Sequence, residues 1–168
     1  PDPERYREAL ADCVEESDRV LSMLKAVMDI AEAEAGMMRL ERGEVELGQL
    51  LTQVVDIYSF IAEEKRITIR KDVPGPCVAW GDANRLRQVF ANLLDNAIKY
   101  TAEGGHVVVR VAAERDRAMV RIRDDGMGIP PAEQDRIWAR LYRGDKSRSQ
   151  RGLGLGLSLV KAVVEAHG

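Results

Sequence analysis

Three polar side chains lie at helical spacing in an otherwise apolar segment, and together they could hold a metal ion and phosphate. Asn92, Asn96 and Lys99 are four and then three residues apart, so on a helix they share one face. Amide oxygens beside an ammonium group suit Mg²⁺ carrying polyphosphate, because this ion prefers oxygen ligands. We predict that Asn96 is the metal ligand, with Asn92 close by and Lys99 near the phosphates. The alternative is a solvated helix face.

Two glycine-containing segments follow further along the chain. Asp124–Ile129 comes directly after an alternating, strand-like segment, and Gly152–Leu157 leads into a helix-compatible segment. Backbone amides at the start of such a helix, unobstructed by Cβ atoms, can bind an anion. The spacing matches neither the lysine-containing phosphate loop nor the dinucleotide-binding fingerprint. The pattern therefore indicates a phosphate site outside those two classes.

In their order along the chain, these motifs resemble those of sensor histidine kinases. Residues 92–100 resemble the N box, 124–129 the first glycine box, 137–145 the F box and 152–157 the second glycine box. The similarity runs from about Leu40 to the C-terminus. More weakly, the N-terminal helix resembles the second helix of the dimerisation and histidine-phosphotransfer domain. The resemblance implies the α/β sandwich of the superfamily of gyrase, chaperone, kinase and mismatch-repair ATPases.

Asp124 and Tyr100 are the predicted contacts to the base. A carboxylate only accepts hydrogen bonds, which suits the exocyclic amine of adenine and disfavours the carbonyl of guanine. The resemblance assigns this role to the aspartate that matches Asp124, whereas the alternative is a turn-initiating Asp before glycine. Asp125 is interpreted as such a turn residue. Tyr100 is predicted to lie against the adenine face, with an ordinary core tyrosine as the alternative.

The F box supplies two arginines that could pair with the charge of the γ-phosphate, Arg140 and Arg143. Of the two, Arg143 matches the family pattern better. Trp138 and Leu141 stand where the family usually has phenylalanine, and both are bulky enough to anchor the segment that follows. Residues 143–151 have almost no apolar mass, so we predict a mobile nucleotide lid there.

The predicted site is therefore one for ATP and Mg²⁺. Its catalytic residues are Asn96, Lys99 and Arg143, and Asn96 is also the metal ligand. The residues predicted to bind nucleotide are Asn92, Asn96, Lys99, Tyr100, Asp124, Gly126, Gly128, Ile129, Arg140, Arg143, Gly152, Gly154, Leu155, Gly156 and Leu157.

Composition restricts the class of protein. The chain has 168 residues, 45% of them hydrophobic and 32% charged, which is typical of a soluble globular protein. Its net charge of -3 provides no overall basic field for nucleic acid or an anionic membrane. Cys13 and Cys77 are interpreted as reduced thiols. We expect a soluble, cytoplasmic portion without membrane contact, and the sequence leaves open whether the parent protein is anchored in the inner membrane.

Residues 3–35 are predicted to form one long helix with an apolar repeat. The repeat consists of Leu10, Val14, Ser17, Leu21, Leu24, Met28, Ala31 and Ala35. Because one helix cannot bury such a stripe by itself, we predict a helical bundle that makes the intact protein a homodimer. The alternative is that the helix packs back on its own domain. Residues 1–38 are assigned to this dimerisation domain.

Residues 39–168 are assigned to an ATP-binding domain, truncated at its C-terminus. Its predicted strands are residues 44–47, 67–73, 77–80, 106–113 and 118–123, and its predicted helices are residues 48–64, the N-box helix capped by Asp82, and residues 158–167. In the helix of residues 48–64, the side chains predicted to face inward are Leu50, Leu51, Val54, Val55, Ile57, Tyr58 and Ile61. The fold class is α+β: an antiparallel, mixed sheet layered with helices as a two-layer α/β sandwich, preceded by the long bundle-forming helix.

The positions of the two histidines bear on where the phosphoacceptor lies. His106 begins a predicted strand and His167 ends a predicted helix, so neither resembles the family's phosphoacceptor on a heptad helix. We therefore expect the acceptor to lie upstream of Pro1. The predicted function is transfer of the ATP γ-phosphoryl group to that histidine, for relay to the receiver domain of a response regulator. The alternatives are an anti-sigma-type serine kinase, another superfamily ATPase, or a non-catalytic nucleotide-binding module.

Overall fold

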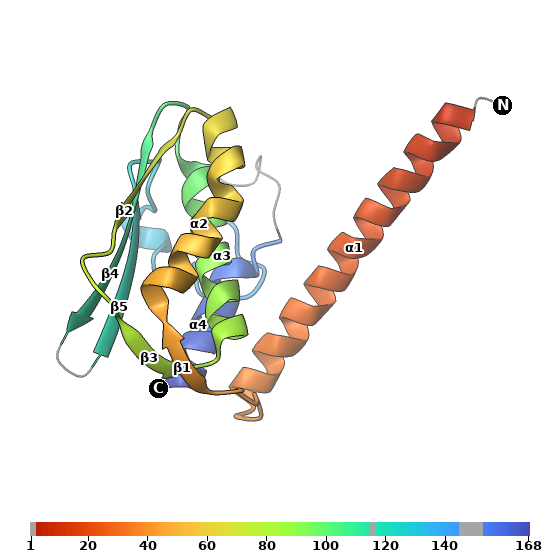
Figure 1. Cartoon of the computed structure of the whole chain (residues 1–168). Helices are drawn as coiled ribbons and strands as arrows, with labels where there is room; N and C mark the ends of the chain where they lie inside the picture. The colour runs from red at the N-terminus through yellow and green to blue at the C-terminus, as the bar shows by residue number, and fades with distance from the viewer. Residues whose placement is uncertain (1–2, 115–116, 145–152) are drawn as a thin grey trace.

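The computed structural model describes residues 3–114, 117–144 and 153–168. It begins with helix α1 (Pro3–Glu34), which confirms the predicted long helix to within one residue. Figure 1 shows α1 extending away from the other elements and meeting them near its C-terminal end. There it packs against helix α4 (Gly156–His167). In the described part of the chain, no helix has both the length and the apolar character needed to cross a membrane.

The strands form two small sheets. Strands β1 (Gly43–Glu46) and β3 (Val78–Gly81) pair antiparallel. In the other sheet, of order β2-β4-β5, strand β4 (His106–Glu114) pairs parallel with β2 (Thr68–Asp72) and antiparallel with β5 (Arg117–Asp124). The prediction of a mixed sheet is confirmed. The parallel pair is reached by a crossover through β3 and a helix, as parallel neighbours require.

Three helices cover one face of the larger sheet, which confirms the two-layer α/β arrangement (Figure 1). They are α2 (Leu47–Glu64), α3 (Ala83–Tyr100) and α4, and α3 packs against both of the others. Alternate residues of β4 are buried, as expected for a sheet with one covered face. The most buried core side chains are Ile30, Leu51, Val54, Leu94, Val107, Val109, Val111 and Val163.

Helix α2 corrects one sequence-based expectation. Leu50, Leu51, Val54 and Val55 were expected to face inward and are buried, whereas Ile57 and Ile61, expected on the same face, are exposed. Tyr58 is half-buried against the core. The apolar stripe of the first three turns therefore does not continue to the end of the helix, because apolar residues there extend around more of the helix than the sheet covers.

Asp82 joins several elements where β3 leads into α3. Its Oδ1 accepts hydrogen bonds from the backbone amides of Asn84 (2.9 Å) and Arg85 (3.1 Å), which confirms the predicted helix cap. Its Oδ2 accepts a bond of 2.9 Å from the amide of Glu41, in the segment after α1. The backbone amide of Asp82 donates to Nε2 of His167 at 3.0 Å. One residue thus connects the α1 connector, α3 and the end of α4.

Candidate functional site

A cavity of about 710 Å³ lies between α3, α1 and the segments that follow β5. It brings together most of the predicted site residues that the structure describes. From α3 come Asn92, Asn96, Lys99 and Tyr100; from the end of β5 and the segment after it, Asp124, Gly128 and Ile129; from the F-box region, Arg143; and from the start of α4 and the residues just before it, Gly154, Leu155, Gly156 and Leu157. Motifs far apart in the sequence therefore surround one space.

The polar stripe of α3 faces this cavity while the opposite side of the helix is buried. On that side, Leu94, Ala97 and Ile98 lie in the core. The side-chain nitrogen of Asn92 donates to the carbonyl of Gln88 at 2.8 Å. Its side-chain oxygen is then turned toward Gly156, where a Cβ atom would lie 2.9 Å from it. This arrangement presents an amide oxygen, the type of atom that binds Mg²⁺.

The segment that carries Asp124 is held against the end of α3. A Cβ atom at Gly126 would lie 2.4 Å from the carbonyl oxygen of Tyr100, so the backbone can approach this closely only with glycine. The amide of Met127 donates to the same carbonyl at 3.3 Å. Oδ1 of Asp124 accepts from the amide of Gly126 at 3.0 Å, and Asp124 also borders the cavity. Asp124 therefore makes the turn contact and also borders the cavity, and its predicted contact to the base stays a prediction.

Asp125 does more than the predicted turn residue would. Its Oδ1 accepts from the backbone amide of His106 at 2.8 Å, and its Oδ2 lies 3.0 Å from Nδ1 of the same histidine. These bonds, first from the backbone and then from the side chain of His106, hold the pKa of Asp125 below its ordinary value. The pair fixes the start of β4 to the end of β5, next to the segment that borders the cavity.

The start of α4 is shaped by two glycines. Gly154 has a positive φ of 70°, and a Cβ atom there would lie 2.6 Å from the carbonyl oxygen of Tyr142. At the next glycine, Gly156, the helix begins beside Asn92. No side chain among the described residues caps this helix, so its first amides are available to an anion. Gly152 and residues 145–151, including most of the predicted lid, lie outside the described residues.

The two F-box arginines are placed differently. Arg143 borders the cavity. Arg140 points to α1 instead: its Nε donates to Oε1 of Glu34 at 3.1 Å, and the two side chains form an ion pair. Trp138 and Leu141, expected to anchor the following segment, are 41% and 63% exposed. Trp138 borders a second cavity of about 400 Å³ between the end of α1 and α4.

One wall of the main cavity was missed in the sequence, because α1 supplies it. Arg19, Ser22, Met23 and Ala26 border the cavity, and they recur at spacings of three, one and three residues along a single face of the helix. Their helical spacing beside the heptad repeat is the one signal that could have identified them. Because the four residues differ in character, they form no hydrophobic pattern.

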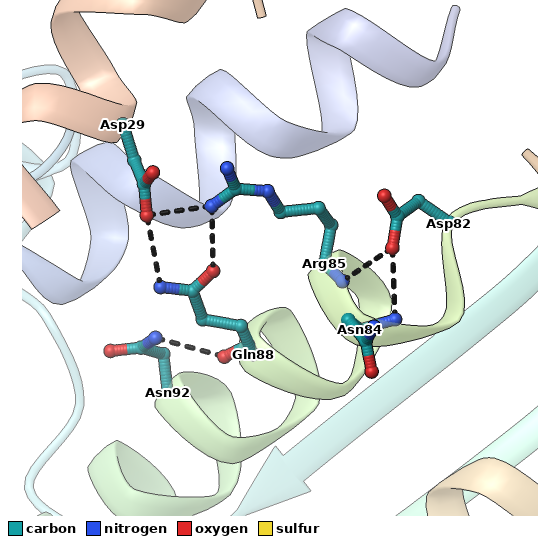
Figure 2. A network of polar contacts seen from close by, with 6 residues as sticks. All are labelled: Asp29, Asp82, Asn84, Arg85, Gln88 and Asn92. Carbon is teal, nitrogen blue, oxygen red and sulfur yellow. Dashed lines mark hydrogen bonds and ion pairs between the residues drawn. The ribbon is translucent and has the colours of Figure 1, made fainter. Parts of the chain in front are cut away.

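A buried ion pair continues the same stripe of α1 and joins it to α3 (Figure 2). Oδ2 of Asp29 lies 2.7 Å from the guanidinium of Arg85 and accepts a bond of 3.4 Å from Gln88. The side-chain oxygen of Gln88 also accepts a hydrogen bond from Arg85, and its backbone carbonyl accepts one from the side-chain nitrogen of Asn92. Asp29 is 5% exposed. The C-terminal part of α1 is therefore docked on the helix that carries the polar stripe.

The fold and the site define a class of protein. A mixed sheet covered on one face by helices, with a polar helix stripe and a glycine-shaped helix start around one cavity, is the arrangement expected of the ATPase superfamily. Residues 81–168 match the family described as "Histidine kinase-, DNA gyrase B-, and HSP90-like ATPase", and the chain belongs to this family. Relatives named as sensor histidine kinases include WalK of Bacillus subtilis, 27% identical over 91% of this chain, and the probable kinase TcrY of Mycobacterium tuberculosis, 34% identical over 99%.

Three comparisons illustrate the likeness. The chain is 35% identical to the probable sensor protein PcoS of Escherichia coli over 99% of its own length, and it spans 36% of that relative. The crystal structure of full-length ShkA in complex with AMPPNP superposes with a TM-score of 0.82 at 31% identity, covering 95% of this chain and 34% of that one. The structure of the mycobacterial sensor histidine kinase MprB superposes with a TM-score of 0.65 at 32% identity, covering 76% of this chain and 80% of that one.

Proposed function

We propose that the chain binds Mg-ATP and is the catalytic part of a sensor histidine kinase that transfers the γ-phosphoryl group to a histidine outside residues 1–168. The observation that carries this proposal is the convergence of the α3 stripe, the Asp124 segment and the open start of α4 on one cavity. The ShkA structure, a complex with AMPPNP, supports a nucleotide as the occupant. Residues 1–38 would belong to the dimerisation domain and residues 39–168 to the nucleotide domain.

The residues around the cavity fit the two ends of a nucleotide. Tyr100, at the end of α3, and Asp124, at the end of β5, would contact the base. Asn96, with the turned amide of Asn92 close by, would hold Mg²⁺, which neutralises charge on the phosphates when bound. Lys99 and Arg143 would stabilise the remaining phosphate charge, assisted by the first amides of α4.

Nucleotide choice is tested by calorimetric titration with ATP and GTP. ATP should bind more tightly than GTP, because the carboxylate of Asp124 accepts from an amine and is mispaired with a carbonyl. Asp124→Asn should weaken ATP binding by about 1–3 kcal/mol. The matched control is Asp135→Asn, an exposed aspartate in the segment after β5 that does not border the cavity. Equal affinity of the parent chain for ATP and GTP would overturn the role given to Asp124.

The metal role of Asn96 is tested by comparing ATP affinity with and without Mg²⁺. Asn96→Ala should remove most of the gain in affinity that Mg²⁺ provides. Asn84→Ala, on the same helix but outside the cavity, should keep it. Circular dichroism would confirm that both variants keep the fold. If Asn96→Ala gains as much from Mg²⁺ as the parent chain, another residue is the ligand.

The structure gives both histidines other partners, which supports an acceptor elsewhere. His106 pairs with Asp125, and the ring of His167 contacts the amide of Asp82 and the carbonyl of Val163. With labelled ATP, residues 1–168 should therefore not label themselves. Adding the upstream helix of the parent protein should yield an acid-labile, base-stable phosphohistidine, which a response regulator receiver domain should then accept. Acid-stable label on Ser or Thr would instead indicate a serine kinase.

A further inference from the structure

Arg19 is a cation that α1 brings to the main cavity. It borders the cavity together with Ser22, Met23 and Ala26 of the same helix face. Its guanidinium is paired at 3.4 Å with Glu16 across one turn of the helix, and both side chains are about half-exposed or more. An exposed pair of this kind is weak, so an anion in the cavity could replace Glu16 as the partner at little cost.

The ion pair between Asp29 and Arg85 indicates which part of α3 Arg19 lies opposite. Asp29 contacts Arg85 and Gln88 near the start of α3, and α1 and α3 run in opposite directions (Figure 1). Arg19 precedes Asp29 by ten residues, a rise of about 15 Å along a helix. The same rise from Arg85 and Gln88 along α3 reaches residues 95–98. Counted along the two helices, Arg19 thus corresponds to the turn of α3 that carries Asn96, and both residues border the cavity.

Apart from Arg19, the acidic and basic residues that border the cavity offset each other. Asp95, Asp124 and Glu133 border it with negative charge, and Lys99, Arg121 and Arg143 with positive charge. A polyphosphate adds several negative charges, and guanidinium groups bind phosphate oxygens with two parallel hydrogen bonds. Arg19 differs from the other cations because it belongs to α1 and reaches the cavity from the helix rather than from the nucleotide domain.

We propose that Arg19 binds a phosphate group of the nucleotide from α1, and that the Asp29–Arg85 ion pair holds it in position. The inference rests on the proposed function, because it assigns Arg19 to the same site. Its consequence is that the affinity for phosphates depends on the docking of α1. The chain would then bind ATP more tightly when α1 is docked on the nucleotide domain than when it is not.

The test compares the affinities for Mg-ATP and adenosine, measured by calorimetry. Arg19→Gln should weaken ATP binding about three- to tenfold and leave adenosine unchanged, because the lost contact is to phosphate. Arg19→Lys should keep most of the ATP affinity. Lys25→Gln is the matched control: it removes the same charge from an exposed position of α1 that does not border the cavity.

The role of the ion pair is tested in the same assay. In an Asp29→Asn background, Arg19→Gln should change ATP affinity less than twofold, because Arg19 is no longer held at the cavity. A full effect of Arg19→Gln in that background would overturn the positioning role of Asp29. Equal weakening of ATP and adenosine, or no change in either, would overturn the phosphate contact while leaving nucleotide binding by the parent chain intact. A parent chain that binds no ATP would overturn the proposed function itself.

Discussion

The two faces of α1 differ in composition and in surroundings. One face, formed by Arg19, Ser22, Met23, Ala26, Asp29, Ile30 and Ala33, meets the nucleotide domain. The other, formed by Leu10, Val14, Leu21, Leu24 and Met28, is more apolar and remains exposed. The sequence posed a choice between a bundle partner and packing on the chain's own domain. In the structure one face of the helix packs on the domain and the other is exposed, and the exposed face is the one predicted to meet a bundle partner.

The difference shows that apolar content alone does not identify which face of a helix docks within a chain. The face against the nucleotide domain uses small residues, one deeply buried isoleucine and ion pairs. An ion pair forms only when both side chains are opposite each other, so these pairs fix the position of α1 along the domain. The exposed face has the apolar heptad repeat, interrupted at Ser17, that suits a helical bundle. Three predictions test this contrast, and a fourth tests how the connector after α1 is held; they are given from the largest expected effect to the smallest.

Removing the buried anchor should destabilise the chain most. Ile30 is 1% exposed, so Ile30→Ala should lower the free energy of unfolding by about 2–5 kcal/mol, through lost burial and a cavity. Leu24→Ala, on the exposed face, should change it by about 0.5 kcal/mol or less at dilute protein concentration. Urea unfolding followed by circular dichroism gives both values. Equal costs would contradict the assignment of the two faces.

Breaking the buried ion pair comes next. Arg85→Leu leaves the carboxylate of Asp29 buried without its partner and should cost about 2–4 kcal/mol of stability. Lys71→Leu breaks the exposed pair with Asp56 and should cost about 1 kcal/mol or less. The comparison uses the same unfolding assay. If the two variants lose the same stability, the Asp29–Arg85 contact does not fix α1 on the domain.

The apolar face should control self-association. Leu24 is exposed in the single chain and is expected to be buried in the bundle, so Leu24→Asp should weaken dimerisation by about 1.5–3 kcal/mol per chain. Analytical ultracentrifugation over a range of concentrations measures this change, and ATP affinity should stay the same. A variant that dimerises like the parent chain would place the interface on another surface.

The smallest effect concerns acid stability at the connector. Burial opposes ionisation of Asp82, but hydrogen bonds from the amides of Arg85, Glu41 and Asn84 outweigh it and lower its pKa. Ionised Asp82 therefore contributes stability that is present above pH 3.8 and is lost as the pH falls through the lowered pKa. Asp82→Asn should cost about 1 kcal/mol at neutral pH and flatten this acid dependence in unfolding curves. An unchanged acid profile would contradict the assignment.

Local patterns predicted much of the fold and the site. The spacing of Asn92, Asn96 and Lys99 identified the face of α3 that borders the cavity, and Asp82 marked the helix start. These signals are contained in a few neighbouring residues, since helix periodicity and caps act over one or two turns. The strand segments were found for the same reason, because alternation with one buried face is also local.

What the sequence did not reveal depends on partners far apart in the chain. Asp29 meets Arg85 across 56 positions, and Arg140 meets Glu34 across 106. No short-range pattern selects one partner among the many charged residues of this chain. The exposure of Ile57 and Ile61 was missed because it depends on how much of α2 the sheet covers, which is a property of the packing rather than of the helix.

The contacts around Asp82 also have a consequence for local opening of the chain. Arg42 donates to the carbonyls of Ala166 and His167, and Asp82 binds both the amide of Glu41 and the ring of His167. Because these bonds link the α1 connector, the start of α3 and the end of α4, we expect the three segments to open together when the amides of Glu41 and Asp82 exchange with solvent. In a native-state hydrogen-exchange experiment these amides would share one opening free energy, so the connector would behave as part of the domain.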